Sequence, residues 1–506
     1  MNRISVLMVG SIAALVGLVL LLRTPPERTI KRPTSKAETA PVAAPQKPLI
    51  VFCAASNRPV LEVIRRDYEA EFGVALQIEY GPSQTLLATH EVSRTGDLFL
   101  PADESYIEQA RTKQLVQEVL PLAQMQAVLA VAKGNPKNIK SLADLLADDV
   151  KLLQANPEAA AIGMLTKAQF TKLGKWEPLA AKSAYKTTVN EVANDIKVGS
   201  ADVGIVWDVV LVPMPELEAV RLPELESLVA NVSISVLNST TQPQRALHFA
   251  RYMQAVDRGQ KRYKELGFKV IESADEWADV PELKLFAGSM LRPAIEDTIT
   301  KFEAREGVQV SRVYNGCGIL VTQMKAGQMP DAYFACDNEF MQQVEDFFPR
   351  PMSVSQNELV ILVAKGNPKG IKNLKDLGKP GLRVGIGHEK QCAMGWLTQK
   401  TLEEGRVQDI VMKNVAVQTP TGDMLVNQMK TGSLDAAVAY LSNAAGSADT
   451  LDAIRIKDLK CSVATQPFAV ATKSRHPQLA ARLAAALKSA ESKERFLNEG
   501  FRWQAE

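Results

Sequence analysis

A long internal repeat constrains this chain more than any other feature of its sequence. Residues 131–137 read VAKGNPK and recur unchanged at 363–369, a displacement of 232 residues. Other identities fall at displacements of 232 to 234, and they include Phe52/Phe286, Arg58/Arg292, Pro59/Pro293, Asp97/Asp331, Asp103/Asp337 and Asp202/Asp435. A period of about 230 residues is far too long for a stacked solenoid repeat, so each copy is predicted to be a complete domain.

The repeat divides the chain of 506 residues into four predicted parts. Residues 1–24 are expected to be an N-terminal transmembrane anchor or signal, and 25–47 a linker rich in Pro, Lys and Ala. The first copy occupies 48–277 and the second 278–506. The chain is therefore expected to place two related domains behind one N-terminal segment.

The N-terminal segment is predicted to stay attached to the protein. Residues 4–22 carry no charge and are mostly apolar, and a helix of that length spans roughly one bilayer core. Arg23, Thr24, Pro25 and Pro26 follow, which makes a poor cleavage site and favours an anchor over a signal peptide. Positive charge flanks both ends of the run, so charge does not decide its orientation.

Composition narrows the classes of function. Hydrophobic residues make up 46% and charged residues 23% of the chain, and the net charge is +2. These are ordinary globular values without a concentrated basic surface, so no nucleic-acid partner is expected. The five cysteines fit no zinc spacing, so no metal site is expected. Most cysteines are predicted to be small buried residues, and because their number is odd, at least one stays unpaired or pairs with another chain.

Short apolar runs alternate with helical patterns in both copies, which predicts an α/β fold. The expected architecture is two tandem bilobal domains, each made of mostly parallel sheets flanked by helices. The strands expected in the two copies are 49–53, 75–80, 127–132, 204–207 and 232–237, then 283–287, 308–314, 359–364, 436–440 and 467–472.

Two serines in the first copy suggest an anion site. Ser56 and Ser83 each follow an expected strand and precede an expected helix. Open α/β sheets bind ligands beyond the carboxyl ends of their strands, where helix N-termini present N–H groups and a positive dipole end. Two hydroxyls there could meet on one tetrahedral oxyanion. The alternative is that both serines are ordinary helix N-caps.

Several motifs of the first copy are similar to those of one known family. They are VFCAAS at 51–56, YGPS at 80–83, GDLFLPAD at 96–103, NPEAAAIG at 156–163 and GSADVGIVW at 199–207. In this order and spacing they resemble the periplasmic molybdate/tungstate-binding family, the solute-binding proteins of ABC transporters. The similarity covers 48–272 and returns over 282–503.

The resemblance implies the type II periplasmic-binding-protein fold in two solute-binding-like domains. It also implies a protein that is not an enzyme and has no cofactor, but binds an oxyanion such as molybdate or tungstate. Its expected partner is an ABC permease, and the membrane holds it through the N-terminal helix. The bulk of the chain is then expected in the periplasm or elsewhere on the extracytoplasmic side.

The family's ligand contacts carry over to the first copy residue by residue. Ser56 and Ser83 correspond to its two serines, and Ala161 and Val189 mark its backbone N–H donors. Trp207 stands where the family has a tyrosine, and its indole N–H still donates but has a different reach.

The second copy departs further from the family pattern. Ser289 is expected at the first serine position, Cys317 replaces the second serine, and Ala393 and Tyr440 complete the site. A thiol is a weaker donor than a hydroxyl, so this copy is expected to bind less well or to bind something else.

An arginine follows the first serine position of each copy. Arg58 and Arg292 are possible anion contacts, or else exposed residues of a first helical turn.

Three other functions stay open at this point. The protein could be a tethered sensor or scaffold whose oxyanion site is altered or lost. It could be a metal-binding relative, for which Asp103 and Asp337 supply carboxylates. It could be an enzyme in which His388 activates Cys317, although the binding-protein fold already accounts for both positions.

Overall fold

The structure, a computed structural model, describes residues 47–457 and 459–505. The predicted anchor at 1–24 and the linker up to residue 46 lie outside this part of the chain. Among the residues that are described, no helix combines the length and apolar character needed to cross a bilayer.

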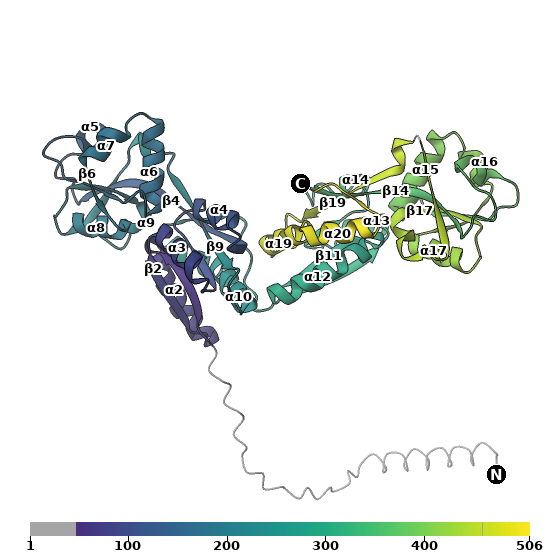
Figure 1. The fold of residues 1–506 in the computed structure, drawn as a ribbon, viewed down its shortest axis with the longest axis horizontal. Coiled ribbons are helices and arrows are strands. Elements are labelled where there is room, and N and C mark those ends of the chain that lie inside the picture. The colour runs from purple at the N-terminus through teal and green to yellow at the C-terminus, as the bar shows by residue number, and fades with distance from the viewer. Residues whose placement is uncertain (1–46, 458, 506) are drawn as a thin grey trace, which may run out of the picture. The chain divides into compact units, whose positions relative to one another are not determined.

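Each repeat is built on a ten-stranded mixed sheet (Figure 1). In the first repeat the strand order is β2-β1-β3-β9-β4-β7-β5-β6, and β8 and β10 also pair with β4. The strands are β1 (Leu49–Ala54), β2 (Leu76–Gly81), β3 (Leu98–Leu100), β4 (Val116–Ala132), β5 (Leu152–Ala155), β6 (Ser183–Lys186), β7 (Val203–Trp207), β8 (Leu217–Val220), β9 (Val229–Leu237) and β10 (Lys269–Val270).

Strand β4 is shared by two lobes. Its first part pairs antiparallel with β9, and its second part, from Ala127 to Val131, pairs antiparallel with β7. One lobe gathers around β1, which is parallel to β2 and β3, and the other around β5, which is parallel to β6 and β7. Figure 1 shows the two groups of helices and strands at either end of β4. The predicted bilobal α/β domain is therefore present.

Helices cover these strands where the sequence has a helical apolar pattern. In α2 the buried residues Val60, Leu61, Ile64 and Tyr68 form one face, and Gly73 ends the helix with a φ of 66° that a glycine adopts without strain. The helices of the first repeat are α2 (Arg58–Phe72), α3 (Ser83–Ser93), α4 (Ser105–Thr112), α5 (Leu142–Leu145), α6 (Ala161–Lys172), α7 (Trp176–Lys182), α8 (Val189–Lys197), α9 (Asp208–Leu211), α10 (Pro243–Gln254) and α11 (Gly259–Glu265).

The second repeat has the same topology. Its strand order is β12-β11-β13-β19-β14-β17-β15-β16, and β18 and β20 also pair with β14. The strands are β11 (Glu282–Gly288), β12 (Gln309–Asn315), β13 (Ala332–Phe334), β14 (Met352–Ala364), β15 (Val384–Gly387), β16 (Val415–Thr419), β17 (Ala436–Tyr440), β18 (Leu451–Arg455), β19 (Val463–Val470) and β20 (Arg502–Trp503). The identical order of strands in both sheets confirms that a whole fold was duplicated.

The helices of the second repeat follow the same plan, and each repeat buries a hydrophobic core of its own. These helices are α12 (Arg292–Glu306), α13 (Cys317–Lys325), α14 (Asn338–Gln342), α15 (Ala393–Glu404), α16 (Gln408–Met412), α17 (Gly422–Lys430), α18 (Leu441–Ala444), α19 (Pro477–Leu487) and α20 (Ala490–Asn498).

Candidate functional site

Five of the residues predicted for the first site line one small cavity between the two lobes of that repeat. They are Ser56, Ser83, Ala161, Val189 and Trp207. The centre of a water-sized sphere can move through about 20 Å³ of this cavity. The other lining residues are Ala54, Ala55, Gly81, Pro82, Ala102, Ala160, Ile162 and Thr188. None of the lining residues carries a charged side chain.

Helix N-termini meet at the cavity. Three lining residues are the first residues of helices: Ser83 of α3, Ala161 of α6 and Val189 of α8. The first N–H groups of a helix have no acceptor within that helix, and the helix dipole is positive at this end. The cavity is thus electropositive without any cationic side chain, which suits an anion whose charge is spread over several oxygens.

Both serine side chains are buried at the cavity wall. Ser56 is 4% exposed, and its Oγ has no hydrogen-bond partner among the described residues. The N–H of Ala102 donates to Ser83 Oγ at 3.1 Å, which leaves the hydroxyl hydrogen of Ser83 to donate elsewhere. Neither serine caps a helix, because the N-caps of this region are Ala54, Asn57 and Pro82. The N-cap alternative for these serines is therefore wrong.

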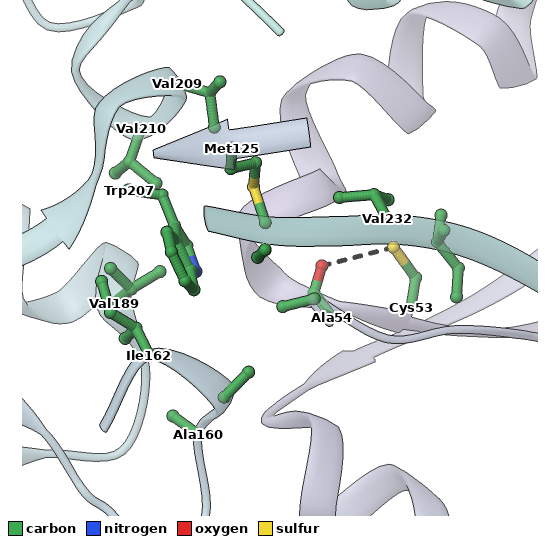
Figure 2. Close-up of a cluster of buried hydrophobic side chains, with 14 of the residues drawn as sticks. Cys53, Ala54, Met125, Ala160, Ile162, Val189, Trp207, Val209, Val210 and Val232 are labelled. Carbon is green, nitrogen blue, oxygen red and sulfur yellow. Dashed lines mark hydrogen bonds between the residues drawn. The ribbon is translucent and has the colours of Figure 1, made fainter. Parts of the chain in front are cut away.

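Trp207 forms the opposite wall of the cavity. It ends β7 and is 1% exposed. Figure 2 shows its ring beside Val189 and Ile162, with the indole nitrogen on the side that faces Ala54 from the other lobe. The indole therefore adds one N–H donor and fills much of the space between the lobes.

The two lobes touch in both repeats. The N–H of Gln84 in α3 donates to the carbonyl oxygen of Ala159, just before α6, at 3.1 Å. At the matching place in the second repeat the N–H of Gly318 donates to the carbonyl oxygen of Gln391, also at 3.1 Å. Both clefts are thus closed.

The two arginines lie over tyrosine rings, and Arg58 does not line the first cavity. The guanidinium of Arg58 lies 5.0 Å from the ring centroid of Tyr80, and that of Arg292 lies 5.6 Å from the ring centroid of Tyr314. Arg58 is exposed and is absent from the cavity lining, and Arg292 is exposed as well. The alternative of an exposed first-turn arginine describes Arg58, whereas Arg292 is exposed but acts electrostatically on Asp423 at the second cleft.

The second repeat lacks both serine hydroxyls of the first. Ser289 begins the 3₁₀ turn Ser289–Leu291, as Ala55 begins Ala55–Asn57, and Met290 takes the place of Ser56. Each of the two turns is followed directly by its helix, so they align without a gap and Ser289 matches Ala55. The prediction for Ser289 is therefore wrong by one residue. Cys317 does begin α13, as Ser83 begins α3.

Cys317 forms a disulfide with Cys336, with their Cα atoms 6.4 Å apart. The expected thiol donor is therefore wrong, since the bonded sulfur has no hydrogen. The expectation of at least one unpaired cysteine is confirmed, because Cys53, Cys392 and Cys461 are free. The pairing matches a contact of the first repeat, because Cys317 and Cys336 occupy the positions of Ser83 and Ala102, which are hydrogen-bonded there.

Other groups at the second cleft also differ in chemistry. Tyr440 ends β17 as Trp207 ends β7, and its buried hydroxyl has no partner among the described residues. Ala393 is the buried first residue of α15. Asp423 is the second residue of α17, where α8 has the neutral Asn190, and burial raises the pKa of its carboxyl. Burial also raises the pKa of Asp337 to about 6.

The carboxylates proposed for a metal have another role. Asp337 is the N-cap of α14 and accepts the N–H of Glu339 at 2.9 Å, and Asp103 accepts the N–H of Ser105, the first residue of α4, at 2.9 Å. Within 47–457 and 459–505, no group of three His, Cys, Asp or Glu residues is arranged to hold a metal ion. Because Cys317 is in a disulfide, it lacks the free thiol that a cysteine–histidine enzyme would need.

Comparison with known proteins agrees with this geometry. The family model of the bacterial extracellular solute-binding proteins matches residues 49–269 and 283–502. The molybdate-binding protein ModA of Mycobacterium tuberculosis (strain ATCC 25618 / H37Rv) is 28% identical over 224 residues, which cover 43% of this chain and 83% of that protein. The molybdate-binding protein ModA of Escherichia coli (strain K12) is 26% identical over 166 residues, covering 31% of this chain and 65% of that protein.

Solved structures are similar over one repeat's length. The periplasmic molybdate-binding protein of Azotobacter vinelandii matches 44% of this chain and 100% of its own, with 18% identity and a TM-score of 0.40. The substrate-binding domain of a putative molybdenum ABC transporter from Clostridium difficile matches 44% of this chain and 99% of its own, with 24% identity and a TM-score of 0.36.

Proposed function

Because the chain belongs to the bacterial extracellular solute-binding protein family, we propose that its first repeat binds a tetrahedral oxyanion such as molybdate or tungstate and delivers it to an ABC permease. One observation carries this proposal. Ser56 Oγ is buried in a small cavity where three helices begin, and it has no hydrogen-bond partner in the described part of the chain. Its hydroxyl can therefore donate a hydrogen bond to an acceptor on a bound ligand. An oxyanion supplies such acceptors.

The size and chemistry of the cavity favour a small anion over other solutes. A cavity in which the centre of a water-sized sphere can move through only about 20 Å³ is too small for a sugar or a peptide. A cation would meet several N–H and O–H hydrogens and no carboxylate. Each hydrogen bond to a charged group contributes roughly 1.5–3 kcal/mol, so a few well-placed donors are enough for tight binding.

Closing of the lobes provides the signal for delivery. An anion that draws donors from both lobes stabilises the closed form, in which α3 contacts the loop before α6. A permease that recognises this form takes up the loaded receptor. We place the bulk of the protein on the extracytoplasmic side, held by the apolar segment 4–22.

A tethered sensor is the second candidate function. It is favoured by the difference between the two clefts, since the second has Met290 and a disulfide where the first has its serines. A receptor that only carries cargo has no need of a second, altered domain. The two functions differ in one measurement, because a loaded transport receptor stimulates the ATPase activity of its permease and a sensor does not.

A thermal-shift series on the full chain tests the oxyanion site. The ligands are molybdate, tungstate, sulfate, phosphate and ferric citrate. A ligand at about 100 times its dissociation constant stabilises the native state by roughly 2.7 kcal/mol, so a clear shift is expected with molybdate or tungstate. The variant Ser56→Ala/Ser83→Ala should lose this shift.

Ser93→Ala is the matched control, because Ser93 is an exposed residue at the far end of α3. It should keep the full shift. If no oxyanion stabilises the chain, the proposed function is wrong and the sensor becomes the leading candidate.

A further inference from the structure

Three of the five cysteines occupy positions that line the cavity in the first repeat. Cys317 begins α13 as Ser83 begins α3, and Cys336 lies two residues beyond β13 as Ala102 lies two residues beyond β3. Cys392 is the N-cap of α15, as Ala160 is of α6. Sulfur has therefore replaced three small or hydroxyl-bearing residues around one cleft.

Contacts across the second cleft join the chain segments that carry the three cysteines. Cys317 and Cys336 are bonded within one lobe. Both neighbours of Cys317 meet Gln391, which precedes Cys392 in the other lobe. The N–H of Gly318 donates to the carbonyl oxygen of Gln391 at 3.1 Å, and a Cβ on Gly316 would collide with that same oxygen. The segment that carries the free thiol of Cys392 thus contacts the start of α13, where Cys317 lies, when the lobes are closed.

The wall behind the sulfurs is shaped for them. Gly288 stands where the first repeat has Ala54, and a Cβ on it would collide with Cys336 Sγ and lie 3.2 Å from Cys317 Sγ. The buried hydroxyl of Tyr440 has no partner among the described residues. The carboxyl of Asp337 is buried in this repeat, whereas that of Asp423 is exposed, and negative charge on either opposes an oxyanion and favours a cation.

We propose that the second cleft, once its disulfide is reduced, binds one soft, thiophilic metal ion such as monovalent copper through Cys317, Cys336 and Cys392. Thiolate sulfur is the ligand that such ions prefer. A dithiol reductant supplies two electrons and two protons, becomes a disulfide itself, and leaves two thiols on Cys317 and Cys336. Each thiol that coordinates the ion then releases its proton to solvent.

The arrangement of the oxidised state agrees with this chemistry. In the described part of the chain no three His, Cys, Asp or Glu residues are arranged as a metal site while the sulfurs of Cys317 and Cys336 are bonded to each other. The proposed site therefore requires reduction, because Cys392 is the one of these three cysteines that has a free thiol in this structure. The metal spans both lobes, because Cys392 comes from the lobe opposite to the other two cysteines.

Copper binding to the full chain tests the proposal. The reduced and the oxidised protein are each mixed with monovalent copper held by a weak competing chelator, and the metal retained after gel filtration is counted. Reduced protein should retain one copper ion per chain and show sulfur-to-copper charge-transfer absorption. Oxidised protein should retain none, and Cys392→Ala should weaken binding by at least about tenfold because one of three sulfur ligands is gone.

Cys461→Ala is the matched control, since Cys461 is a free cysteine outside the cleft positions. It should leave the affinity unchanged. Cys317→Ala shows whether the disulfide cysteines are needed, and it should also weaken binding by at least about tenfold, because one of the three sulfur ligands is gone. The proposal is overturned if reduced protein retains no copper, or if Cys392→Ala binds it as tightly as the unchanged chain. The molybdate shift recorded on the same samples reports on the first repeat separately.

Discussion

At the scale of single residues, Trp207 defines the shape of the first cavity. Its ring is rigid, reaches across from the second lobe and carries one N–H donor (Figure 2). A tyrosine at this place, like Tyr440 in the second repeat, would carry its donor at the tip of a smaller ring. The indole therefore makes the cavity narrower, and that narrowing bears on which oxyanion fits.

Replacing Trp207 by Phe tests the indole as a donor. The change removes the N–H but keeps an apolar ring. Because a hydrogen bond to a charged group contributes roughly 1.5–3 kcal/mol, the dissociation constant of the oxyanion should rise about ten- to a hundredfold. Isothermal titration measures this change, and Trp503→Phe in the second repeat is the control. An unchanged affinity would show that the indole only fills space.

The carboxyl of Asp337 gives the second repeat a pH dependence. Burial raises its folded-state pKa to about 6. Between the usual value near 4 and this value the folded state holds the proton more tightly than the unfolded state does. Stability is therefore present in full below about pH 4, falls as the pH rises to about 6, and stays reduced above it by up to about 3 kcal/mol.

Asp337→Asn should remove this loss. The amide oxygen can still accept the N–H of Glu339, as the carboxylate does at 2.9 Å. Urea unfolding at pH 4 and pH 7.5 should give equal stability at the lower pH and a more stable variant at the higher one. Asp435→Asn is a useful contrast, because Arg383 lowers the pKa of Asp435 and the variant should lose stability at pH 7.5. A variant that gains nothing at pH 7.5 would contradict the account of Asp337.

At the scale of elements, the start of α6 depends on a glycine. A Cβ on Gly163 would collide with the carbonyl oxygen of Ala155 and lie 2.8 Å from Asn156 C, at the end of β5. Gly395 in α15 meets the end of β15 in the same way. Close approach of helix and strand therefore fixes where α6 presents its N–H groups to the cavity.

Gly163→Ala should disturb both stability and binding. Overpacking of a close helix–strand contact costs roughly 1–3 kcal/mol, and the displaced helix should weaken oxyanion binding as well. Gly446→Ala is the control, since Gly446 has a φ of −81° and no atom within 4 Å of an added Cβ. Urea unfolding and titration measure the two effects. If Gly163→Ala behaves like Gly446→Ala, the close packing does not position the helix.

The positions of the strands were easier to predict from the sequence than the way the strands pair. The apolar runs at 49–53 and 436–440 became β1 and β17 almost residue for residue, because buried strands leave a clear pattern. The course of β4 over 17 residues was not foreseen, since polar residues interrupt its first part where it pairs with β9. Pairing is set by tertiary contacts that no local pattern records.

The candidate site was predictable where the repeat and the family pattern agree. Ser56, Ser83, Ala161, Val189 and Trp207 do line one cavity. In the second repeat the register of Ser289 was mistaken by one residue, because a serine next to the right position looks like a match. The disulfide had no signal in the sequence, because the positions of Cys317 and Cys336 become neighbours only in the folded domain, as Ser83 and Ala102 do.

At the scale of the whole molecule, one chain holds two clefts of the same fold and different chemistry. The first offers hydroxyl and N–H donors and no charged side chain, and the second offers sulfur and the buried carboxyl of Asp337. Duplication kept the topology of the sheet and changed the residues at the carboxyl ends of its strands. The two repeats are therefore expected to have different ligands.

Titration of the full, oxidised chain with molybdate tests the central claim most directly, because it counts the sites and assigns them together. The account predicts one bound anion per chain, lost in Ser56→Ala/Ser83→Ala and retained in Ser289→Ala. Two bound anions per chain, or binding that survives loss of both serine hydroxyls, would contradict it.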